Sequence, residues 1–457
     1  MNNSKPNFVI IYPDSMGANS LGCYGNSYAK TPCMDKLAEE GMMFTQATSC
    51  NPVCMPSRAS LHTGRYVGGH NVRNNCTEEL SGTYPSIAQS LRADGYRLAY
   101  YGKTHSLIQE EWDDVFDLYP DYNRYLKGRR INVKYPEKPS SEVLCAGISK
   151  IPEEDFSENI LGNLGESFIY EMANSEEPFL LFMSHEAPHS PWVIPEGREE
   201  LYESFDVVLP EVPEEHLDGR AEEQTSYLKK RGSMATDDKL RHAIKTYMTL
   251  LKIVDENVGK LVDALKETGQ LDNTVIVIMS DHGDNLGNHR SMGKGVSLDE
   301  NLVHIPMVFY APKKWRAGKN AALTQNIDLY PTILELAGIT PPPGIQGMSL
   351  KSLLENQCGE LRDYAFSEEH SDGYECRFSA RDARYKLVFC EYGNEELYDL
   401  ENDPHEWNNL IACDELQDKI TELKNAMLRW RFHCIDRKVP ESDNWITRFM
   451  KPDSAIY

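Results

Sequence analysis

Short apolar runs, bounded by polar or turn-forming residues, recur along the first three quarters of the chain. The clearest is Thr274–Ser280, which contains Val-Ile-Val-Ile-Met. Runs of this length with β-branched residues at their centre predict strands of a buried sheet. The predicted strands are Phe8–Tyr12, Arg97–Tyr101, Phe179–Ser184, Thr274–Ser280 and Ile305–Tyr310.

Stretches with apolar residues at helical spacing lie between these runs. The longest is Lys239–Thr268, which is amphipathic and stops before Gly269, as helices commonly do. The other predicted helices are Met34–Glu40, Pro85–Ala93, Phe156–Ala173 and Asp328–Ala337. Strands separated by helices predict an α/β fold, with a large mixed, mostly parallel sheet sandwiched between helices.

The pattern changes after Pro341–Gly344, which reads Pro-Pro-Pro-Gly. Short strand candidates and a final helix at Asp414–Phe432 predict a small antiparallel sheet with one packed helix. The strand candidates are Tyr364–Ser367, Glu375–Ala380, Tyr385–Cys390 and Glu396–Asp399. We therefore expect an α/β domain over residues 1–358 and an α+β subdomain over 359–457. Its tail is expected to wrap the body of the same chain or a neighbouring subunit, so the sequence leaves a homo-oligomer as one possibility.

Polar side chains follow four of the predicted strands, at the point where each strand ends. Ligands of open α/β sheets bind beyond the carboxyl ends of the strands. Exits that carry carboxylates, lysines and histidines therefore predict one shared site. The residues at these exits are Asp14, Lys103, His105, His185, His189, Asp281 and His282.

Composition and charge restrict the partners. The chain has 457 residues and a formal net charge of −24, which disfavours nucleic acid and anionic membranes as partners. An anionic substrate would need a local positive pocket. No apolar run reaches the roughly 18 residues of a membrane span, and no secretory signal is visible at the N-terminus. We therefore expect a cytoplasmic protein. Its 11 cysteines suit buried thiols better than a disulfide framework.

Residues 54–65 read Cys-Met-Pro-Ser-Arg-Ala-Ser-Leu-His-Thr-Gly-Arg. This stretch resembles the signature of the type I sulfatases, Cys-x-Pro-Ser-Arg followed by Leu-x-Thr-Gly-Arg. In that family a maturation enzyme oxidises the cysteine to formylglycine, an aldehyde whose hydrate has two hydroxyl groups. The resemblance implies this fate for Cys54, and it implies that a formylglycine-generating enzyme is a partner of the chain.

Further segments resemble the same family in the same order along the chain. Ser280-Asp281-His282-Gly283 is similar to the branch with an Asp-His metal pair. Asp14-Ser15 departs from the two adjacent acids that many relatives have after the first strand. The other matching segments are Gly102-Lys103-Thr104-His105, Pro188-His189-Ser190-Pro191, Leu286-Gly287-Asn288-His289, Lys294-Gly295 and Asp328 to Gly338.

The resemblance implies a role for each of these residues. A divalent cation would be held by Asp14, Cys54, Asp281 and His282. Carboxylate oxygens favour calcium, whereas the histidine leaves manganese or magnesium open. Arg58 and His289 would hold and activate residue 54, helped by His105. Three further residues would contact the sulfate oxygens: Lys103, His189 and Lys294. Of these, His189 or Lys294 would protonate the leaving oxygen.

The sequence leaves several functions open. The first is hydrolysis of a sulfate monoester on a saccharide such as a glycosaminoglycan fragment, with choline sulfate and aryl sulfates as other small anionic substrates. The second is hydrolysis of phosphonate monoesters or phosphodiesters at the same site. The third is a binding protein in which Cys54 stays a thiol. Two long insertions, 110–151 and 195–235, are expected to shape the pocket. Within the second, Lys229-Lys230-Arg231 is interpreted as a solvated loop that could guide a polyanion.

Overall fold

The structure is a computed structural model of the chain. It describes residues 5–75, 85–105, 115–118, 144–295, 297–356, 359–370, 376–392 and 394–434. Most of the predicted insertion at 110–151 and nearly all of the tail after His433 lie outside these residues. No helix that it describes is both long and apolar enough to cross a membrane.

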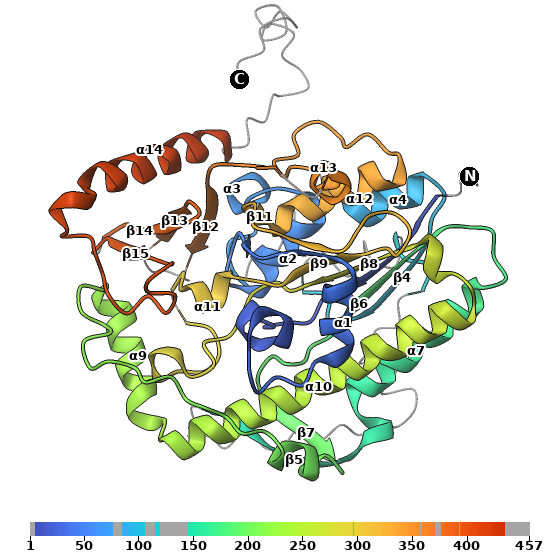
Figure 1. Cartoon of the computed structure of the whole chain (residues 1–457), viewed down its shortest axis with the longest axis horizontal. Helices are drawn as coiled ribbons and strands as arrows, with labels where there is room; N and C mark the ends of the chain where they lie inside the picture. Colours follow the sequence, from blue (N-terminus) through green and yellow to red (C-terminus); the bar gives the residue numbers. More distant parts are fainter. Residues whose placement is uncertain are drawn as a thin grey trace, which may run out of the picture.

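A seven-stranded sheet forms the centre of the molecule (Figure 1). Strands β8, β1, β6 and β4 are parallel neighbours, and β9 pairs antiparallel with both β8 and β2. The mixed, mostly parallel sheet predicted from the sequence is therefore confirmed. In spatial order the strands are β10 (Gly318–Asn320), β2 (Met42–Phe44), β9 (Met307–Tyr310), β8 (Thr274–Met279), β1 (Asn7–Ile11), β6 (Phe179–Ser184) and β4 (Arg97–Gly102).

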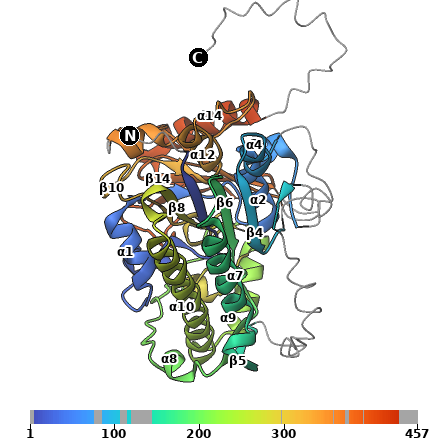
Figure 2. The same ribbon diagram turned by 90° about the vertical axis from the view of Figure 1, so that its right-hand side faces the viewer.

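Helices cover both faces of this sheet (Figures 1 and 2). Successive side chains of a strand point to opposite faces, so Val9 and Ile11 of β1 pack in one core cluster, and Phe8 and Ile10 pack in the other. On the first face lie α1 (Pro32–Glu40), α7 (Ser157–Met172) and α10 (Asp237–Glu267). On the second lie α2 (Cys54–Thr63), α4 (Ile87–Ala93), α12 (Leu329–Ala337) and α13 (Lys351–Asn356).

Capping explains why one helix begins later than its sequence pattern predicts. The Ser86 hydroxyl accepts a hydrogen bond from the backbone N–H of Gln89 at 3.2 Å, and the Gln89 side chain accepts one from the N–H of Ser86 at 2.7 Å. This reciprocal pair satisfies two donors that a helix start leaves unpaired. Helix α4 therefore begins at Ile87 and not at Pro85.

The structure adds elements that the hydrophobic pattern did not predict. The insertion at 195–235 contains α8 (Glu199–Glu203) and α9 (Glu222–Met234), so Lys229–Arg231 belongs to a helix and not to a solvated loop. Burial of Leu228, which is 3% exposed, ties this helix to the body. The other additions are β2, β10, α2 and α13, described above, together with α3 (Val67–His70), α11 (Glu300–Val303), the pair β5 (Ala146–Pro152) with β7 (Trp192–Glu196), and the pair β3 (Ala47–Thr48) with β11 (Thr324–Gln325). Short 3₁₀ turns lie at Ala18–Ser20, Gly22–Tyr24, Glu153–Asp155, Leu271–Asn273, Asn288–Arg290, Asn326–Asp328 and Asp414–Leu416.

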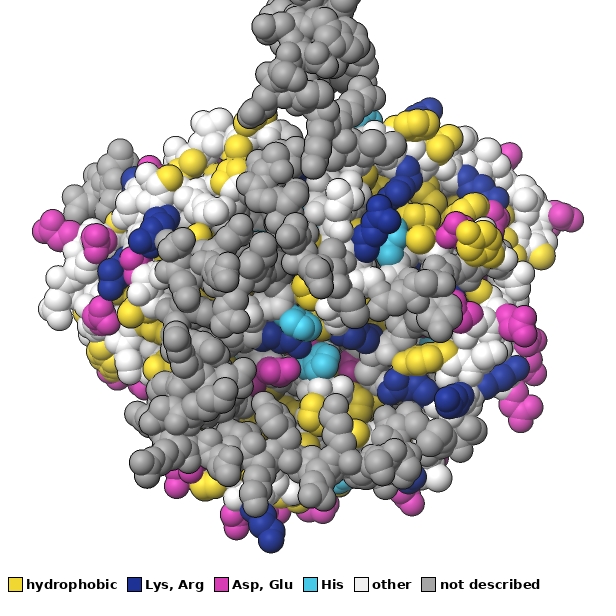
Figure 3. All heavy atoms as spheres, turned by 180° about the vertical axis from the view of Figure 1, so that it is seen from behind, with side chains coloured by type: hydrophobic (Ala, Val, Ile, Leu, Met, Phe, Trp, Pro, Cys, Tyr) yellow, Lys and Arg dark blue, Asp and Glu magenta, His cyan; other side chains and the backbone are white. Residues whose placement is uncertain are grey.

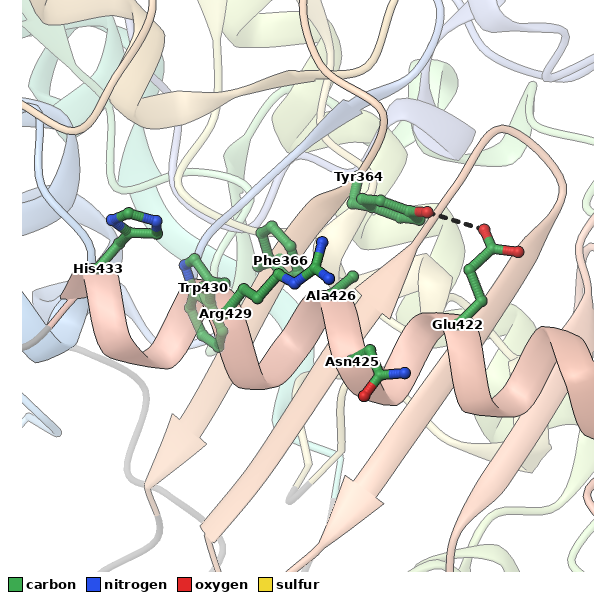
Figure 4. A pocket seen from close by; sticks show the side chains of 8 residues that line it. All are labelled: Tyr364, Phe366, Glu422, Asn425, Ala426, Arg429, Trp430 and His433. Carbon is green, nitrogen blue, oxygen red and sulfur yellow. Dashed lines mark hydrogen bonds between the residues drawn. The ribbon is translucent and has the colours of Figure 1, made fainter. Parts of the chain in front are cut away.

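The C-terminal part forms the predicted four-stranded antiparallel sheet with one helix. Trp430 of the helix stacks on Phe366 with ring centroids 4.8 Å apart, beside a surface cavity of about 470 Å³ (Figure 4). Trp430 also meets the edge of Tyr66 at 5.3 Å. This helix therefore joins the small sheet to the segment that follows α2. The elements are β12 (Ala365–His370), β13 (Cys376–Arg381), β14 (Tyr385–Cys390), β15 (Glu396–Asp399) and α14 (Gln417–Cys434).

Candidate active site

The carboxyl ends of the four parallel neighbours β8, β1, β6 and β4 bring their following residues together at one edge of the sheet. Asp14 follows β1, Lys103 follows β4, and Asp281 follows β8. Lys103 Nζ lies 2.9 Å from Asp14 Oδ2, and the amide N–H of Ser15 donates to Asp281 Oδ1 at 3.1 Å. The strand exits that the sequence singled out thus converge on one cluster.

Cys54 is the first residue of α2 and is only 1% exposed. Its Sγ lies 2.8 Å from Lys294 Nζ, 3.3 Å from His282 Nε2 and 3.7 Å from Asp14 Oδ1. A helix N-terminus and a lysine both favour negative charge at a sulfur. Cys54 therefore lies at the centre of the cluster, where its side chain contacts both the positive Lys294 and the negative Asp14.

Arg58 lies one helical turn after Cys54 and is fully buried beneath the cluster. Its Nε donates to Asp281 Oδ2 at 2.9 Å, and its Nη2 donates to Asp14 Oδ2 at 3.2 Å. A third donor, Nη1, reaches Ser184 Oγ at 2.7 Å. The guanidinium therefore fixes the two carboxylates directly, whereas the sequence predicted that it would hold residue 54.

The donor atoms of the four predicted metal ligands lie within 4.8 Å of one another, and all four residues are buried. The Gly283 carbonyl accepts from His282 Nδ1 at 2.9 Å, so Nε2, which faces Cys54, is the nitrogen that would bind a metal. Carboxylate oxygens and an imidazole nitrogen suit divalent cations. The set formed by Asp14, Cys54, Asp281 and His282 therefore fits such an ion.

The pKa values of the two carboxyl groups of the cluster, Asp14 and Asp281, are shifted in opposite directions. Burial by itself would raise the pKa of Asp14, but the charges of Lys103, His189 and Arg58 outweigh it and hold this pKa well below its usual range. Burial, followed by the charge of Asp14, raises the pKa of Asp281. Two buried carboxylates beside each other repel, and a bound cation would relieve this repulsion.

The thiol of Cys54 is strongly acidified. Burial and the charge of Asp14 both act to raise its pKa, yet Lys294, His282 and Lys103 together hold that pKa well below the usual value for cysteine. The thiolate is the reactive form of cysteine. This environment therefore distinguishes Cys54 from Cys50, whose pKa is raised well above its usual value by burial.

Three further cations line the cluster within a protein of net charge −24. Lys103 and Lys294 approach Asp14 and Cys54 respectively, and His189 Nε2 lies 3.9 Å from Asp14 Oδ1. The side chain of His189 is 23% exposed, so it borders solvent. Figure 3, which shows the molecule from behind the view of Figure 1, has histidine, lysine or arginine, and acidic side chains gathered at the middle of the face it draws. These cations supply the local positive pocket that an anionic substrate needs.

Ser15 stands where many relatives of the family have a second acid. Its backbone has a positive φ of 65°, its hydroxyl donates to Asp14 Oδ1 at 3.0 Å, and its N–H donates to Asp281. The position therefore orients both carboxylates through hydrogen bonds and adds no negative charge.

Two of the predicted site residues, His105 and His289, have surroundings that differ from the sequence-based expectation. His105 follows Lys103 and is exposed. His289 has a positive φ of 49° in its 3₁₀ turn, and its Nε2 lies 3.3 Å from Arg220 Nη2 and 3.7 Å from Asp299 Oδ2. Burial and Arg220 lower the pKa of His289 to about 3. Within the described residues, neither histidine forms a hydrogen bond with the sulfur of Cys54.

Several supporting residues escaped the sequence reasoning. The hydroxyls of Ser49 and Ser57 both donate to the Asp281 carbonyl, at 2.5 Å and 2.6 Å, and Asn326 Nδ2 donates to Ser57 Oγ at 2.9 Å. Ser57 belongs to the signature motif and Ser184 ends a predicted strand, so the place of each residue in the sequence could have indicated that it lies at the site. Ser49 and Asn326 carry no such signal because only the fold brings them to the site. His185, in turn, binds Glu158 at 2.6 Å and is held in a buried structural pair.

A mostly parallel sheet between helices, with acid, histidine and lysine side chains at its strand ends, is an arrangement found in the alkaline-phosphatase-like superfamily, to which the sulfatase family belongs. The family model described as Sulfatase matches residues 6–339. A second model, described as the C-terminal part of N-sulphoglucosamine sulphohydrolase, matches residues 287–433. The chain therefore belongs to the sulfatase family and is a hydrolase of sulfuric esters.

Known proteins similar to this chain differ in the substrates that their names state. The N-acetylglucosamine-6-O-sulfatase of Bacteroides thetaiotaomicron is 26% identical, with 93% of this chain and 86% of that protein covered. The choline-sulfatase of Rhizobium meliloti is 28% identical, with 100% of this chain and 93% of that protein covered. The structure of the phosphonate monoester hydrolase of Agrobacterium radiobacter has a TM-score of 0.78 at 22% identity, covering 94% of this chain and 96% of that one. The last likeness shows the shared fold.

Proposed function

We propose that this sulfatase hydrolyses a sulfate monoester on a saccharide, such as a glycosaminoglycan fragment, with Cys54 converted to formylglycine. The observation that carries the proposal is the position of Cys54 Sγ beside both Lys294 Nζ and His282 Nε2, at 2.8 Å and 3.3 Å. The match of residues 287–433 to the sulphoglucosamine sulphohydrolase model supports the saccharide. The similar N-acetylglucosamine-6-O-sulfatase supports it as well.

Residue 54 would act as the nucleophile. In the hydrated aldehyde one hydroxyl gives up its proton and its oxygen bonds to sulfur, while the bond from sulfur to the alcohol oxygen breaks and that oxygen takes up a proton. The other hydroxyl then gives up its proton as the aldehyde re-forms, and the bond from carbon to the sulfate oxygen breaks. Lys294 lies within hydrogen-bond distance of the side chain at this position. As a charged ammonium, it is placed to hold residue 54 by donating a hydrogen bond to it.

A divalent cation would be held by Asp14, residue 54, Asp281 and His282, and we propose calcium, with manganese or magnesium as alternatives. When bound, such an ion lowers the pKa of a coordinated hydroxyl and polarises the sulfate. Arg58 keeps the two carboxylates in place from below, through its bonds at 2.9 Å and 3.2 Å. The protein thus holds the ligands before any ion arrives.

The remaining cations would bind the sulfate group and the leaving oxygen. Lys103 and Lys294 carry charge next to the position of the ester, where developing negative charge needs stabilisation. His189 borders solvent, with a 23% exposed side chain. We assign the leaving-group proton to His189 or Lys294, because the alcohol must depart toward the open side of the pocket.

A substrate panel tests the proposal. Sulfate release would be measured with defined sulfated mono- and disaccharides, choline sulfate and an aryl sulfate, and alcohol release with a phosphonate monoester and a phosphodiester. We expect the highest kcat/KM for a sulfated saccharide. If kcat/KM is higher for choline sulfate than for every sulfated saccharide, choline sulfate replaces the saccharide as the proposed substrate. A dominant phosphonate or phosphodiester activity would overturn the assignment, and the Asp281-His282 pair makes this the second candidate.

Mass analysis of the Cys54 peptide tests the nucleophile separately. Conversion exchanges sulfur for oxygen with loss of two hydrogens, and a Cys54→Ala variant should lose activity. Cys23→Ser is the matched control, because the pKa of Cys23 is raised to about 12 by burial and Asp35, so its thiol stays protonated. An alkylatable thiol at position 54 in all molecules from the native host would refute the mechanism.

A further inference from the structure

Helix α9 packs one of its faces against the loop that carries Lys294. The Tyr227 hydroxyl donates to the Lys294 carbonyl at 3.1 Å. One turn later, Arg231 Nη1 donates to the same hydroxyl, and the guanidinium carbon lies 5.4 Å from the centroid of the Tyr227 ring. The ring of Tyr227 also lies 3.0 Å from the place where Gly295 would carry a Cβ. The helix thus forms a wall beside the lysine that meets Cys54.

Arg231 has no carboxylate partner within ion-pair distance in the part of the chain that the structure describes. Other arginines of low exposure do have one: Arg220 reaches Asp299 at 2.7 Å, and Arg377 reaches Glu369 at 3.2 Å. The nearby carboxylate of Asp284 acts on Arg231 electrostatically from beyond that distance. Its Oδ1 already accepts from two backbone N–H groups at 3.0 Å and 2.8 Å.

The guanidinium therefore keeps donors that the protein does not use. Its Nε is buried without an acceptor among the described residues, and its Nη2 lies 3.7 Å from the place where Gly293 would carry a Cβ. Gly293 directly precedes Lys294. An arginine presents a planar set of donors that matches the oxygens of a carboxylate or a sulfate in pairs.

The surroundings favour an anion at this place. Arg231 follows Lys229 and Lys230 in α9, within a chain whose net charge of −24 repels anions at long range. Figure 3 shows lysine and arginine side chains continuing from the central group toward the side of the molecule where α9 lies. A substrate with more than one negative group would therefore gain a local contact here.

We propose that Arg231 binds a second anionic group of the saccharide substrate, a carboxylate or a second sulfate, while the reacting ester lies at residue 54. Arg231 is then a specificity-determining residue, and α9 is the wall that selects multiply charged fragments. The inference rests on the proposed saccharide sulfatase activity.

The test compares substrates with one and with two negative groups. A monosulfated monosaccharide provides the reference; a disulfated monosaccharide and a monosulfated disaccharide with a uronate carboxylate provide the two kinds of second anion. Arg231→Gln should lower kcat/KM for at least one doubly charged substrate by about 10- to 100-fold more than for the reference, because a hydrogen-bonded charge contributes about 1.5–3 kcal/mol. Arg231→Lys should recover part of that difference. The substrate with the larger loss identifies the second anion.

Two controls separate binding from support of Lys294. Tyr227→Phe removes the hydroxyl that Arg231 and the Lys294 carbonyl share, and should lower kcat/KM by similar factors for all substrates. Lys229→Gln removes a neighbouring exposed charge of α9 and should not change the preference. Equal losses for all substrates in Arg231→Gln would overturn the inference and leave the proposed function standing. A wild-type enzyme that hydrolyses none of the saccharides would instead refute the proposed function.

Discussion

Replacement of Gly283 by alanine should misplace a metal ligand without changing any ligand. Gly283 follows His282, and its carbonyl accepts from His282 Nδ1 at 2.9 Å. A Cβ at this position would lie 2.0 Å from the backbone oxygen of Asn301, whereas real Cβ contacts essentially never fall below 3.0 Å. The backbone must therefore move by about 1 Å, which is the difference between 3.0 and 2.0 Å. Because the atom that the Cβ would meet is the backbone oxygen of Asn301, no flexible side chain can move aside to relieve the clash.

A displacement of this size at a site of chemistry can cost about 100-fold in rate, and overpacking costs about 1–3 kcal/mol of stability. We expect kcat/KM for an aryl sulfate to fall by about two orders of magnitude in Gly283→Ala, with a measurable fall in the unfolding temperature. Gly147→Ala is the matched control, because a Cβ there meets nothing within 4 Å. A folded Gly283→Ala enzyme whose kcat/KM lies within about threefold of both the control and the wild type would refute the reasoning.

Further predictions concern the cation, a buried histidine and the C-terminal helix. Calcium at a hundredfold excess over its Kd should raise the free energy of unfolding by about 2.7 kcal/mol relative to chelated protein, and Asp281→Asn should reduce this gain; equal stability with and without calcium would exclude a calcium site. Burial lowers the pKa of His62 from 6.5 to about 3, so between these values the unfolded chain binds a proton that the folded chain does not. His62 therefore lowers stability as pH falls, by about 1.4 kcal/mol per pH unit, and His62→Gln should flatten the measured pH dependence of unfolding by that amount; an unchanged slope contradicts the assignment. Trp430 is 5% exposed, so Trp430→Ala should cost about 3–5 kcal/mol in denaturant unfolding, whereas Leu428→Ala, at a residue 57% exposed, should cost far less; equal costs would refute the role of α14.

Much of the central fold could be predicted from local patterns. Phe179–Ser184 is a strand with the predicted bounds, and Thr274–Met279 is shorter than predicted by one residue, because buried parallel strands are continuous apolar runs. Helix α9 was missed because its apolar periodicity is weak, and contacts such as the ion pair of Glu223 with Arg377 join it to segments far away in the sequence. Strand β2, Met42–Phe44, was missed because a strand of three residues has too little pattern of its own.

The sequence by itself determined the class of site. The signature around Cys54 and the polar residues after four strands named the four metal ligands, and these lie together in the fold. Motifs carry this information because Asp14, Asp281 and His282 follow strands whose direction is set by their own hydrophobic pattern. Cys54 instead begins a helix.

Only the tertiary structure decided which neighbours each side chain meets. It turned Arg58 toward the two carboxylates, directed His289 to Arg220 and placed Arg231 beside the Lys294 loop. These contacts join residues far apart in the sequence, and single values of φ, such as 49° at His289, decide where a side chain points. Neither spacing nor composition specifies such geometry, because it results from the packing of whole elements against one another.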